Sequence, residues 1–276
     1  MKNKFKILSA IAVTGILFTS CYKKFDTNSY APPFTINGFS SVSQIEPASL
    51  VGYWAFDGSL VDSVSGIAAE NTGTSFTGGF KGKAMQGALN SYALATPSAA
   101  ITGMHSFTLA YWVNSPAPST GIIGMVNLAK TDGFWGNIDM FFENGSSNAN
   151  GKFRAHITNG PVDSWVTKDG IVNMHDTWTA VGLTYDEATT TFKLYINASA
   201  VTTNVATGFG PINFTNVGKL VFGCVQFQTT PSQTTATGSQ PWASYLTGQL
   251  DEVRIYNKAL TGDEINAMIV LQGKGK

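Results

Sequence analysis

The residues best suited to recognising a sugar lie in two neighbouring segments, GFWGNIDMFFENG at 133–145 and KFRAHIT at 152–158. Aromatic rings offer broad, rigid contact surfaces, and planar polar groups select among hydroxyls because burying them unpaired is costly. If the two segments form adjacent strands, their polar faces share one surface of a sheet, which we expect to be the concave one. The predicted ligand-binding residues are Trp135, Asn137, Asp139, Glu143, Arg154 and His156.

A second interpretation of these residues stays open. Arg154 with Asp139 or Glu143 would also suit a solvated cross-strand ion pair, which stabilises a sheet by only ~0.2–1 kcal/mol. Trp135 would equally suit the core or the rim of a sheet. Further aromatic candidates for the rim of a binding face are Trp165, Trp242 and Tyr245.

Other familiar chemistries lack their characteristic residues. His105, His156 and His175 are widely spaced, with no HExxH or CxxC pattern, which argues against zinc. The sequence has no GxSxG nucleophile elbow and no glycine-rich phosphate loop. Cys224 is expected to be a small buried hydrophobic residue on a strand. The 17 basic residues balance 17 acidic ones, whereas a nucleic-acid partner would require a concentrated basic patch.

Alternation of apolar and polar residues predicts strands along much of the chain. In HSFTLAYWVN, Phe107, Leu109, Tyr111 and Val113 share one face. The segments 152–158, 178–185, 191–197 and 219–227 also read as strands, and Gly- and Asn-rich turns separate them. This pattern predicts an all-β fold, a two-sheet antiparallel jelly-roll sandwich.

One short helix is predicted at the C-terminal end of the chain. Thr261 and Glu264 fit a capping box, and Leu260 and Ile265 are placed to form a hydrophobic staple. Ile265 and Met268 begin an apolar stripe that can pack on the sandwich.

The chain resembles the LamG-like, concanavalin A-like jelly-roll domains that are common in surface proteins of Bacteroidetes-type bacteria. The resemblance rests on LVGYWAFDGSLVDSVSG at 50–66, SFTLAYWVN at 106–114, DTWTAVGLTYDEATTTFKLYIN at 176–197 and GQLDEVRIYNKALTGDEI at 248–265. It implies binding of carbohydrate or extracellular protein. Some relatives of this fold are glycoside hydrolases, but the position matching their nucleophile is Asn137, which cannot form a glycosyl-enzyme. We therefore expect no enzymatic activity.

The resemblance also implies a structural calcium ion (Ca²⁺). The usual ligands of the family map to Asp57, in FDG, and to Asp251, in LDEVRIYN, and Asp62 lies in the same loop as Asp57. Alternation places Asp251 on the face of Val253 and Ile255, which is expected to point inward, where a carboxylate needs a partner. The predicted metal residues are Asp57, Asp62 and Asp251. In the alternative, Asp57 caps a turn and Asp251 accepts a hydrogen bond from a backbone amide.

The first residues predict an exported lipoprotein. Three lysines precede ILSAIAVTGILF at 7–18, an apolar run shorter than the ~20 residues that a membrane-spanning helix needs. The following LFTSC resembles a bacterial lipobox, which implies cleavage before Cys21 and attachment of lipid to it. In the alternative, an ordinary signal peptide ends beside a chance cysteine. Two or more acyl chains anchor stably, so we expect an outer-membrane lipid anchor facing the cell surface or the periplasm.

The expected organisation has four parts: a signal peptide at 1–20, lipidated Cys21 with a flexible linker at 21–47, a jelly-roll domain at 48–272 and a tail at 273–276. We expect the domain to bind carbohydrate without cleaving it. The alternatives are a structural or adhesive lipoprotein that binds protein partners, and a divergent glycoside hydrolase.

Overall fold

Two eight-stranded sheets face one another in the computed structural model, which describes residues 34–276. The first, here the helix-side sheet, contains β1 (Leu50–Trp54), β3 (Ser75–Gly78), β4 (Lys83–Gln86), β6 (Phe107–Asn114), β11 (Thr179–Asp186), β12 (Thr191–Ile196), β13 (Ser199–Val205) and β16 (Gln249–Tyr256). Its order is β13-β12-β11-β6-β16-β4-β3, and β1 also pairs with β16.

The second, here the open sheet, contains β2 (Glu70–Thr72), β5 (Tyr92–Ala95), β7 (Ile122–Lys130), β8 (Ile138–Phe142), β9 (Gly151–Asn159), β10 (Val162–Ile171), β14 (Val217–Phe222) and β15 (Ala243–Ser244). Its order is β10-β9-β8-β7-β14-β5-β2, with β15 beside β7. Short helices complete the domain: η1 (Val42–Gln44), α3 (Ala99–Thr102), η2 (Gln226–Gln228) and α4 (Gly262–Gln272). The predicted all-β sandwich with a C-terminal helix is confirmed.

Strand alternation fills the space between the sheets. The β6 residues Phe107, Leu109, Tyr111 and Val113 all enter the main core, as predicted, whereas Trp112 points to the outer face of the helix-side sheet. The core receives Ile138, Met140 and Phe142 from β8 and Phe153, Ala155 and Ile157 from β9 of the open sheet. The remaining side chains of each sheet lie on its outer face, and the two outer faces carry different residues.

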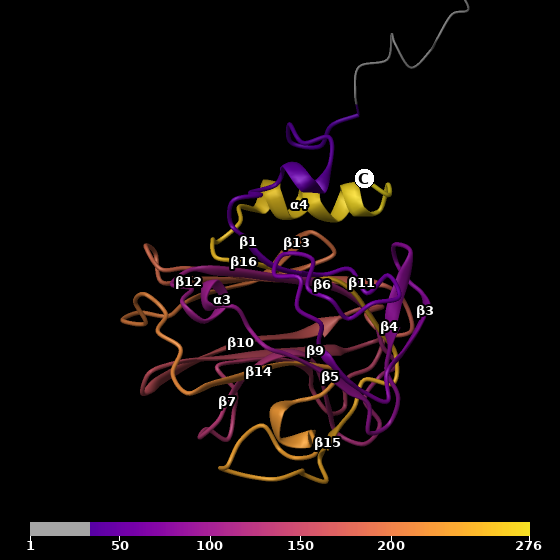
Figure 1. The fold of residues 1–276 in the computed structure, drawn as a ribbon. Helices are drawn as coiled ribbons and strands as arrows, with labels where there is room; N and C mark the ends of the chain where they lie inside the picture. The colour runs from indigo at the N-terminus through magenta and orange to yellow at the C-terminus, as the bar shows by residue number, and fades with distance from the viewer. Residues whose placement is uncertain (1–33) are drawn as a thin grey trace, which may run out of the picture. The chain divides into compact units, whose positions relative to one another are not determined.

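Helix α4 covers the outer face of the helix-side sheet (Figure 1). The predicted capping box is present: the Thr261 hydroxyl accepts from the Glu264 amide, and the Glu264 carboxylate accepts from the Thr261 amide. Trp112 donates its indole N–H to Gln272 at 2.9 Å and stacks on Phe80 with a centroid distance of 3.5 Å. These contacts close one side of the sandwich.

The compact unit begins earlier in the chain than the sequence predicted. Residues Thr35–Lys276 form one unit, so residues 35–47 of the predicted linker belong to the folded part. Val42 and Ile45 are buried in the cluster beneath α4, and the Asn37 side chain donates to the Asp263 carbonyl of α4. Burying these apolar side chains is favourable and holds this stretch in place.

The predicted strand at residues 219–227 is shorter than expected. Strand β14 ends at Phe222, Gly223 adopts a φ of +98°, and η2 follows. A positive φ suits glycine and breaks the strand geometry. Cys224 is fully buried, as expected, but lies in the connection rather than on a strand.

A β-bulge in β16 corrects the predicted orientation of Asp251. The register with β6 shifts between Asp251 and Arg254, and Glu252 has a φ of +52°. Asp251 therefore lies opposite Trp112, on the outer side of the sheet, while Val253 enters the core. An inserted residue reverses the side on which the following side chains lie, so simple alternation misplaced this carboxylate.

The predicted signal peptide and Cys21 lie outside the described residues. Within residues 34–276, no helix has the length and apolar character needed to cross a membrane.

Candidate functional site

The outer face of the open sheet brings together four of the residues discussed above. In the antiparallel register Asp139 of β8 lies opposite His156 of β9, and His156 lies opposite Trp165 of β10. Arg154 lies opposite Phe141. Because residues directly opposite on one face are near neighbours, these side chains form one continuous outer surface.

Aromatic side chains dominate this surface. Trp135 stacks on Phe141 with an interplanar angle of 2° and a centroid distance of 5.4 Å, and its ring centroid is 5.5 Å from that of Trp165. Phe134 lies nearly parallel to Trp242 at 6.1 Å. Phe134, Trp165 and Trp242 are 40%, 37% and 39% exposed, and Trp135 is half-buried among them. We call Phe134, Trp135, Trp165 and Trp242 the aromatic patch.

Two buried glutamines hold the loops that carry the patch. Gln226 accepts from the Lys130 amide and donates to the carbonyls of Gly133 and Phe134, which fixes the turn after β7. Gln228 accepts from the Gln240 amide and donates to the Ala243 carbonyl. These bonds satisfy buried polar groups and set the positions of Phe134 and Trp242. Gln226 lies within the strand predicted at 219–227, and strand alternation gives no sign of this role.

A groove of about 360 Å³ runs beside the patch. Phe134, Trp135 and Val162 supply its apolar wall, while Thr158, Asp163 and Lys130 supply polar groups. An apolar wall with a few polar groups is typical of sites that bind small molecules.

Beneath the groove, His156 bridges two carboxylates. Its Nε2 lies 3.0 Å from an Asp163 oxygen, and its Nδ1 lies 3.4 Å from an Asp139 oxygen. Burial lowers the pKa of His156, but hydrogen bonds and charge from Asp139 and Asp163 outweigh it, so the pKa is raised above its usual 6.5. Burial also raises the pKa of Asp139 above 3.8, although His156 and the Gly136 amide oppose this shift.

Two predicted ligand-binding residues are inaccessible from this face. Asn137 and Asp139 are fully buried. Asn137 donates to the carbonyls of Ala129 and Thr215, and Asp139 accepts from the Gly136 amide at 2.7 Å. Both residues support the backbone around Trp135, since a buried polar group requires partners.

Glu143 and Arg154 are paired with each other at the edge of the same face. Arg154 Nε lies 3.5 Å from Glu143, and its Nη1 donates to Asp169 at 2.6 Å. The ion-pair alternative for Arg154 is therefore realised with Glu143 and Asp169, and not with Asp139. Asp139 is enclosed and Glu143 is occupied by Arg154, so the pair does not present two free carboxylates of the kind that a glycosidase uses.

The predicted metal residues fall into two groups. Asp57 accepts from the Lys83 amide at 2.7 Å, and Asp251 accepts from the Lys81 amide at 3.0 Å. A Cβ at Gly82 would collide with the Asp57 carboxylate, and one at Gly79 would collide with that of Asp251. Both carboxylates therefore face the turn between β3 and β4.

Asp62 takes a different role. Its oxygens accept from the amides of Tyr53, Val64 and Ser65 and from the Ser65 hydroxyl, so it caps its own turn. Asp251 is fully buried, and burial, followed by the charge of Glu252, raises its pKa to about 7 against the effect of backbone hydrogen bonds. No cluster of three or more acidic, His or Cys side chains suited to a metal occurs in residues 34–276.

Comparison with solved structures finds the same fold in proteins of low sequence identity. The Botulinum neurotoxin serotype G binding domain matches with a TM-score of 0.58 at 15% identity, covering 81% of this chain and 51% of that chain. This chain thus spans about half the length of that domain. No curated protein sequence matches significantly.

Two shorter domains match over almost their whole length. The CBM40 of the Ruminococcus gnavus IT-sialidase, bound to α2,3-sialyllactose, gives a TM-score of 0.52 at 14% identity over 67% of this chain and 96% of that chain. Domain 4 of AbnA, an extracellular arabinanase from Geobacillus stearothermophilus, was solved with arabinotriose. It gives 0.52 at 20% identity over 80% of this chain and 98% of that chain. Both structures contain a bound saccharide.

A family model also matches the chain directly. The model Laminin_G_3, described as the concanavalin A-like lectin/glucanases superfamily, matches residues 86–266, more than half of the sequence. The match extends from β4 into α4 and includes the open sheet from β5 to β15. The chain therefore belongs to the concanavalin A-like lectin/glucanases superfamily.

Proposed function

We propose that the outer face of the open sheet binds carbohydrate without cleaving it. The observation that carries this proposal is the aromatic patch, in which three partly exposed rings surround half-buried Trp135 beside a polar groove. Rings that lie flat and rigid can stack on sugar rings at little cost in conformational entropy. Two similar domains were solved with bound saccharides, which supports a glycan as the ligand.

The placement of the carboxylates supports a role without catalysis. A retaining or inverting glycosidase needs two carboxyl groups that reach the scissile bond. Asp139 is fully buried, and Glu143 is tied to Arg154, whereas Asp163 is exposed and available for hydrogen bonds to hydroxyls. In this proposal Trp165 and Trp242 stack on the ligand, and Asp163 and Thr158 provide directional contacts.

Removing a patch ring should weaken glycan binding. For the ligand that a glycan array identifies, we expect Trp165→Ala and Trp242→Ala each to lower affinity at least about tenfold in calorimetry. Truncating a central aromatic at an interface often costs about 2 kcal/mol. Trp178→Ala, which alters a half-buried indole beside Phe80 in the turn between β3 and β4, away from the patch, is the matched control. Unchanged affinity in both patch variants, or selective capture of protein ligands, would contradict the proposal.

The charge of His156 should stabilise the fold in a defined pH range. The pKa of His156 in the folded protein lies above its usual 6.5. The contribution of its charge to the free energy of unfolding is therefore fully present below about pH 6.5 and is lost as pH rises through the folded pKa. We therefore expect His156→Gln to lower the free energy of unfolding more at about pH 6 than at about pH 9. Urea denaturation at both values measures this, with His105→Gln, at an exposed histidine, as control. Equal losses at both pH values would count against the charged bridge.

We also propose that Asp57 and Asp251 hold a structural Ca²⁺. Both carboxylates face one turn, and fully buried Asp251 has no Lys, Arg or His salt bridge among the described residues. A cation bound there would offset the cost of burying that charge. Backbone carbonyls and water would complete the oxygen ligands that calcium prefers. Asp62 is left out because hydrogen bonds within its own turn and with Tyr53 occupy both of its oxygens.

Calcium at millimolar concentration should raise the melting temperature relative to chelator, because a ligand that binds only the folded state stabilises it. Asp57→Asn should remove this shift. Asp62→Asn should lower the melting temperature but keep the calcium shift, which distinguishes a metal ligand from a turn cap. The absence of any calcium shift in the unmodified protein would refute the site.

The N-terminal sequence leads us to propose that the domain is displayed on a lipid anchor at Cys21, at the outer membrane. The basic start, the short apolar run and LFTSC support this. We expect Cys21→Ser to move the protein from the membrane fraction to the soluble fraction after cell lysis. Protease treatment of intact cells then distinguishes the cell surface from the periplasmic side. Membrane association that persists in Cys21→Ser would contradict the anchor.

A further inference from the structure

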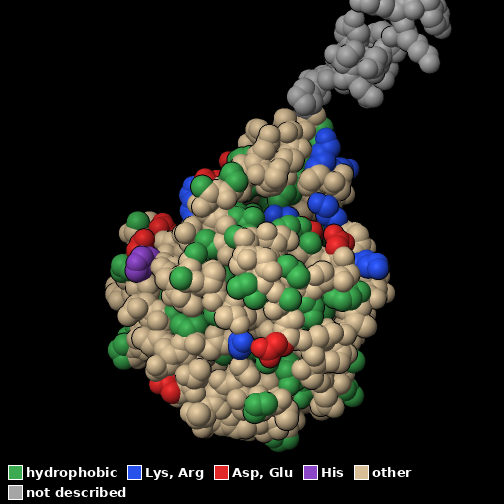
Figure 2. Space-filling view, in the orientation of Figure 1, with side chains coloured by type: hydrophobic (Ala, Val, Ile, Leu, Met, Phe, Trp, Pro, Cys, Tyr) green, Lys and Arg blue, Asp and Glu red, His purple; other side chains and the backbone are tan. Residues whose placement is uncertain are grey.

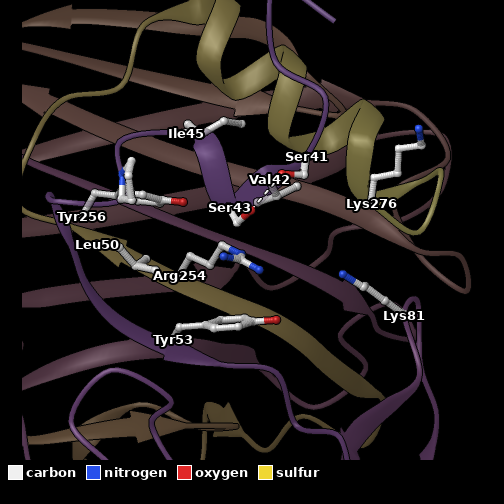
Figure 3. A pocket seen from close by; sticks show the side chains of 11 residues that line it. Ser41, Val42, Ser43, Ile45, Leu50, Tyr53, Lys81, Arg254, Tyr256 and Lys276 are labelled. Carbon is white, nitrogen blue, oxygen red and sulfur yellow. Dashed lines mark hydrogen bonds between the residues drawn. The ribbon is translucent and has the colours of Figure 1, made fainter. Parts of the chain in front are cut away.

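A second cavity lies on the outer face of the helix-side sheet, away from the aromatic patch. Its volume is about 400 Å³, and it lies between η1, β1 and β16 (Figure 3). Val42 and Ile45 from the η1 segment, Leu50 and Tyr53 from β1, and Tyr256 from β16 form its walls. These walls are mostly apolar, and the volume is within the range of small-molecule sites.

Arg254 supplies the buried charge in this cavity. It is only 6% exposed, and its guanidinium carbon lies 3.7 Å from the centre of the Tyr53 ring, a cation–π arrangement. Its Nη2 donates to Glu252 at 3.0 Å, while its buried Nε has no hydrogen-bond partner. A guanidinium carries five N–H donors in a fork that matches a carboxylate, so the bond to Glu252 leaves donors for a ligand.

The Glu252 carboxylate, which pairs with Arg254, also accepts hydrogen bonds from two other side chains. It accepts from the Tyr53 hydroxyl at 2.7 Å and from the Gln272 side chain at 3.0 Å, in addition to Arg254. These bonds fix the guanidinium and the Tyr53 ring against the sheet. The arrangement holds Arg254 in place before any ligand binds, which reduces the entropy lost on binding.

Two lysines also line the cavity. Lys81, from the turn between β3 and β4, extends toward Arg254 in Figure 3. Lys276 also lines the cavity, and none of its lining residues is Asp or Glu. In Figure 2 most Lys and Arg side chains on the visible face lie at the end of the domain that carries η1 and α4. Apart from Glu252, the neighbouring acids have other partners: Asp251 accepts from the Lys81 backbone, and Glu46 pairs with Lys258.

We propose that this cavity binds a small organic carboxylate with an apolar body. Arg254 and Lys81 would hold the carboxylate, and Val42, Leu50 and Tyr256 would contact the apolar part. A neutral sugar would leave the two cations unused, and an inorganic anion would leave the apolar walls uncovered. This site is therefore distinct in place and in chemistry from the carbohydrate site proposed on the open sheet.

Three small ligands, each titrated into the full chain, test separately whether the carboxylate and the apolar body of the ligand contribute to binding. Phenylacetate has both a carboxylate and an apolar ring, phenylacetamide lacks the charge, and acetate lacks the ring. We expect saturable binding of phenylacetate in NMR titration, with a Kd on the order of millimolar or tighter for so small a ligand. The other two probes should bind at least about tenfold more weakly. Equal binding of the amide, or no binding of phenylacetate, would overturn the proposal.

Substitutions at the cavity rim locate the site without removing the buried Arg254–Glu252 pair. Lys81→Glu should weaken phenylacetate binding at least about tenfold, and Ser43→Trp should abolish it by filling the cavity from an exposed position. Lys193→Glu makes the same charge change at an exposed residue of β12 outside the cavity and should leave affinity unchanged. Wild-type affinity in Lys81→Glu and Ser43→Trp, or shifts confined to Trp165 and Trp242, would contradict this site.

Discussion

The two outer faces of the sandwich set the main physical constraint on this protein. Each strand sends alternate side chains into a shared apolar core and leaves the others on an outer face that must be covered or used. On the helix-side sheet, α4, Phe80 and the η1 segment cover Trp112 and its neighbours. On the open sheet, the connection from β14 to β15 covers only part of the face, and a partly exposed aromatic patch remains beside it.

Partly exposed aromatic rings are useful for binding only if they are held in position, and here buried polar side chains hold them. Gln226 and Gln228 tie the two loops that carry Phe134 and Trp242. Asn127 adds a bond from its side chain to the Cys224 carbonyl at 2.6 Å. His156, between Asp139 and Asp163, supports Trp165 from below with a ring centroid distance of 4.6 Å. A rigid support of this kind is what places a binding surface precisely.

Much of the scaffold could be predicted from the sequence, because alternation and capping are local signals. The inward residues of β6 and the Thr261–Glu264 capping box are confirmed in detail. The expectation that Asp139, Arg154 and His156 come from adjacent strands is confirmed, and their side chains share one face of the open sheet. Which of these residues a ligand can reach was not predictable, because Asp139 is enclosed by the turn at Gly136 and by His156 of the neighbouring strand, and alternation does not reveal such contacts.

The misplaced features share a physical origin in non-local contacts. The bulge at Glu252 changes the orientation of Asp251, and no alternation pattern reveals an inserted residue. Gln226 was included in the strand predicted at 219–227 because its bonding partners, the carbonyls of Gly133 and Phe134, lie far from it in the sequence. Residues 35–47 read as a linker because they show little periodicity, yet Val42 and Ile45 are buried in the cluster that includes α4, and Ile36 and Phe39 pack against it.

The carbohydrate site proposed on the aromatic patch of the open sheet can be tested through the protein's own tryptophans. Three of the six tryptophans belong to the aromatic patch, whereas Trp54 lies in the main core and Trp112 and Trp178 lie on the outer face of the helix-side sheet. Their indole N–H signals in NMR therefore report the position of a ligand directly. On titration with the oligosaccharide that a glycan array identifies, the signals of Trp135, Trp165 and Trp242 should move. Those of Trp54, Trp112 and Trp178 should stay in place. Movement confined to the second group would contradict this account.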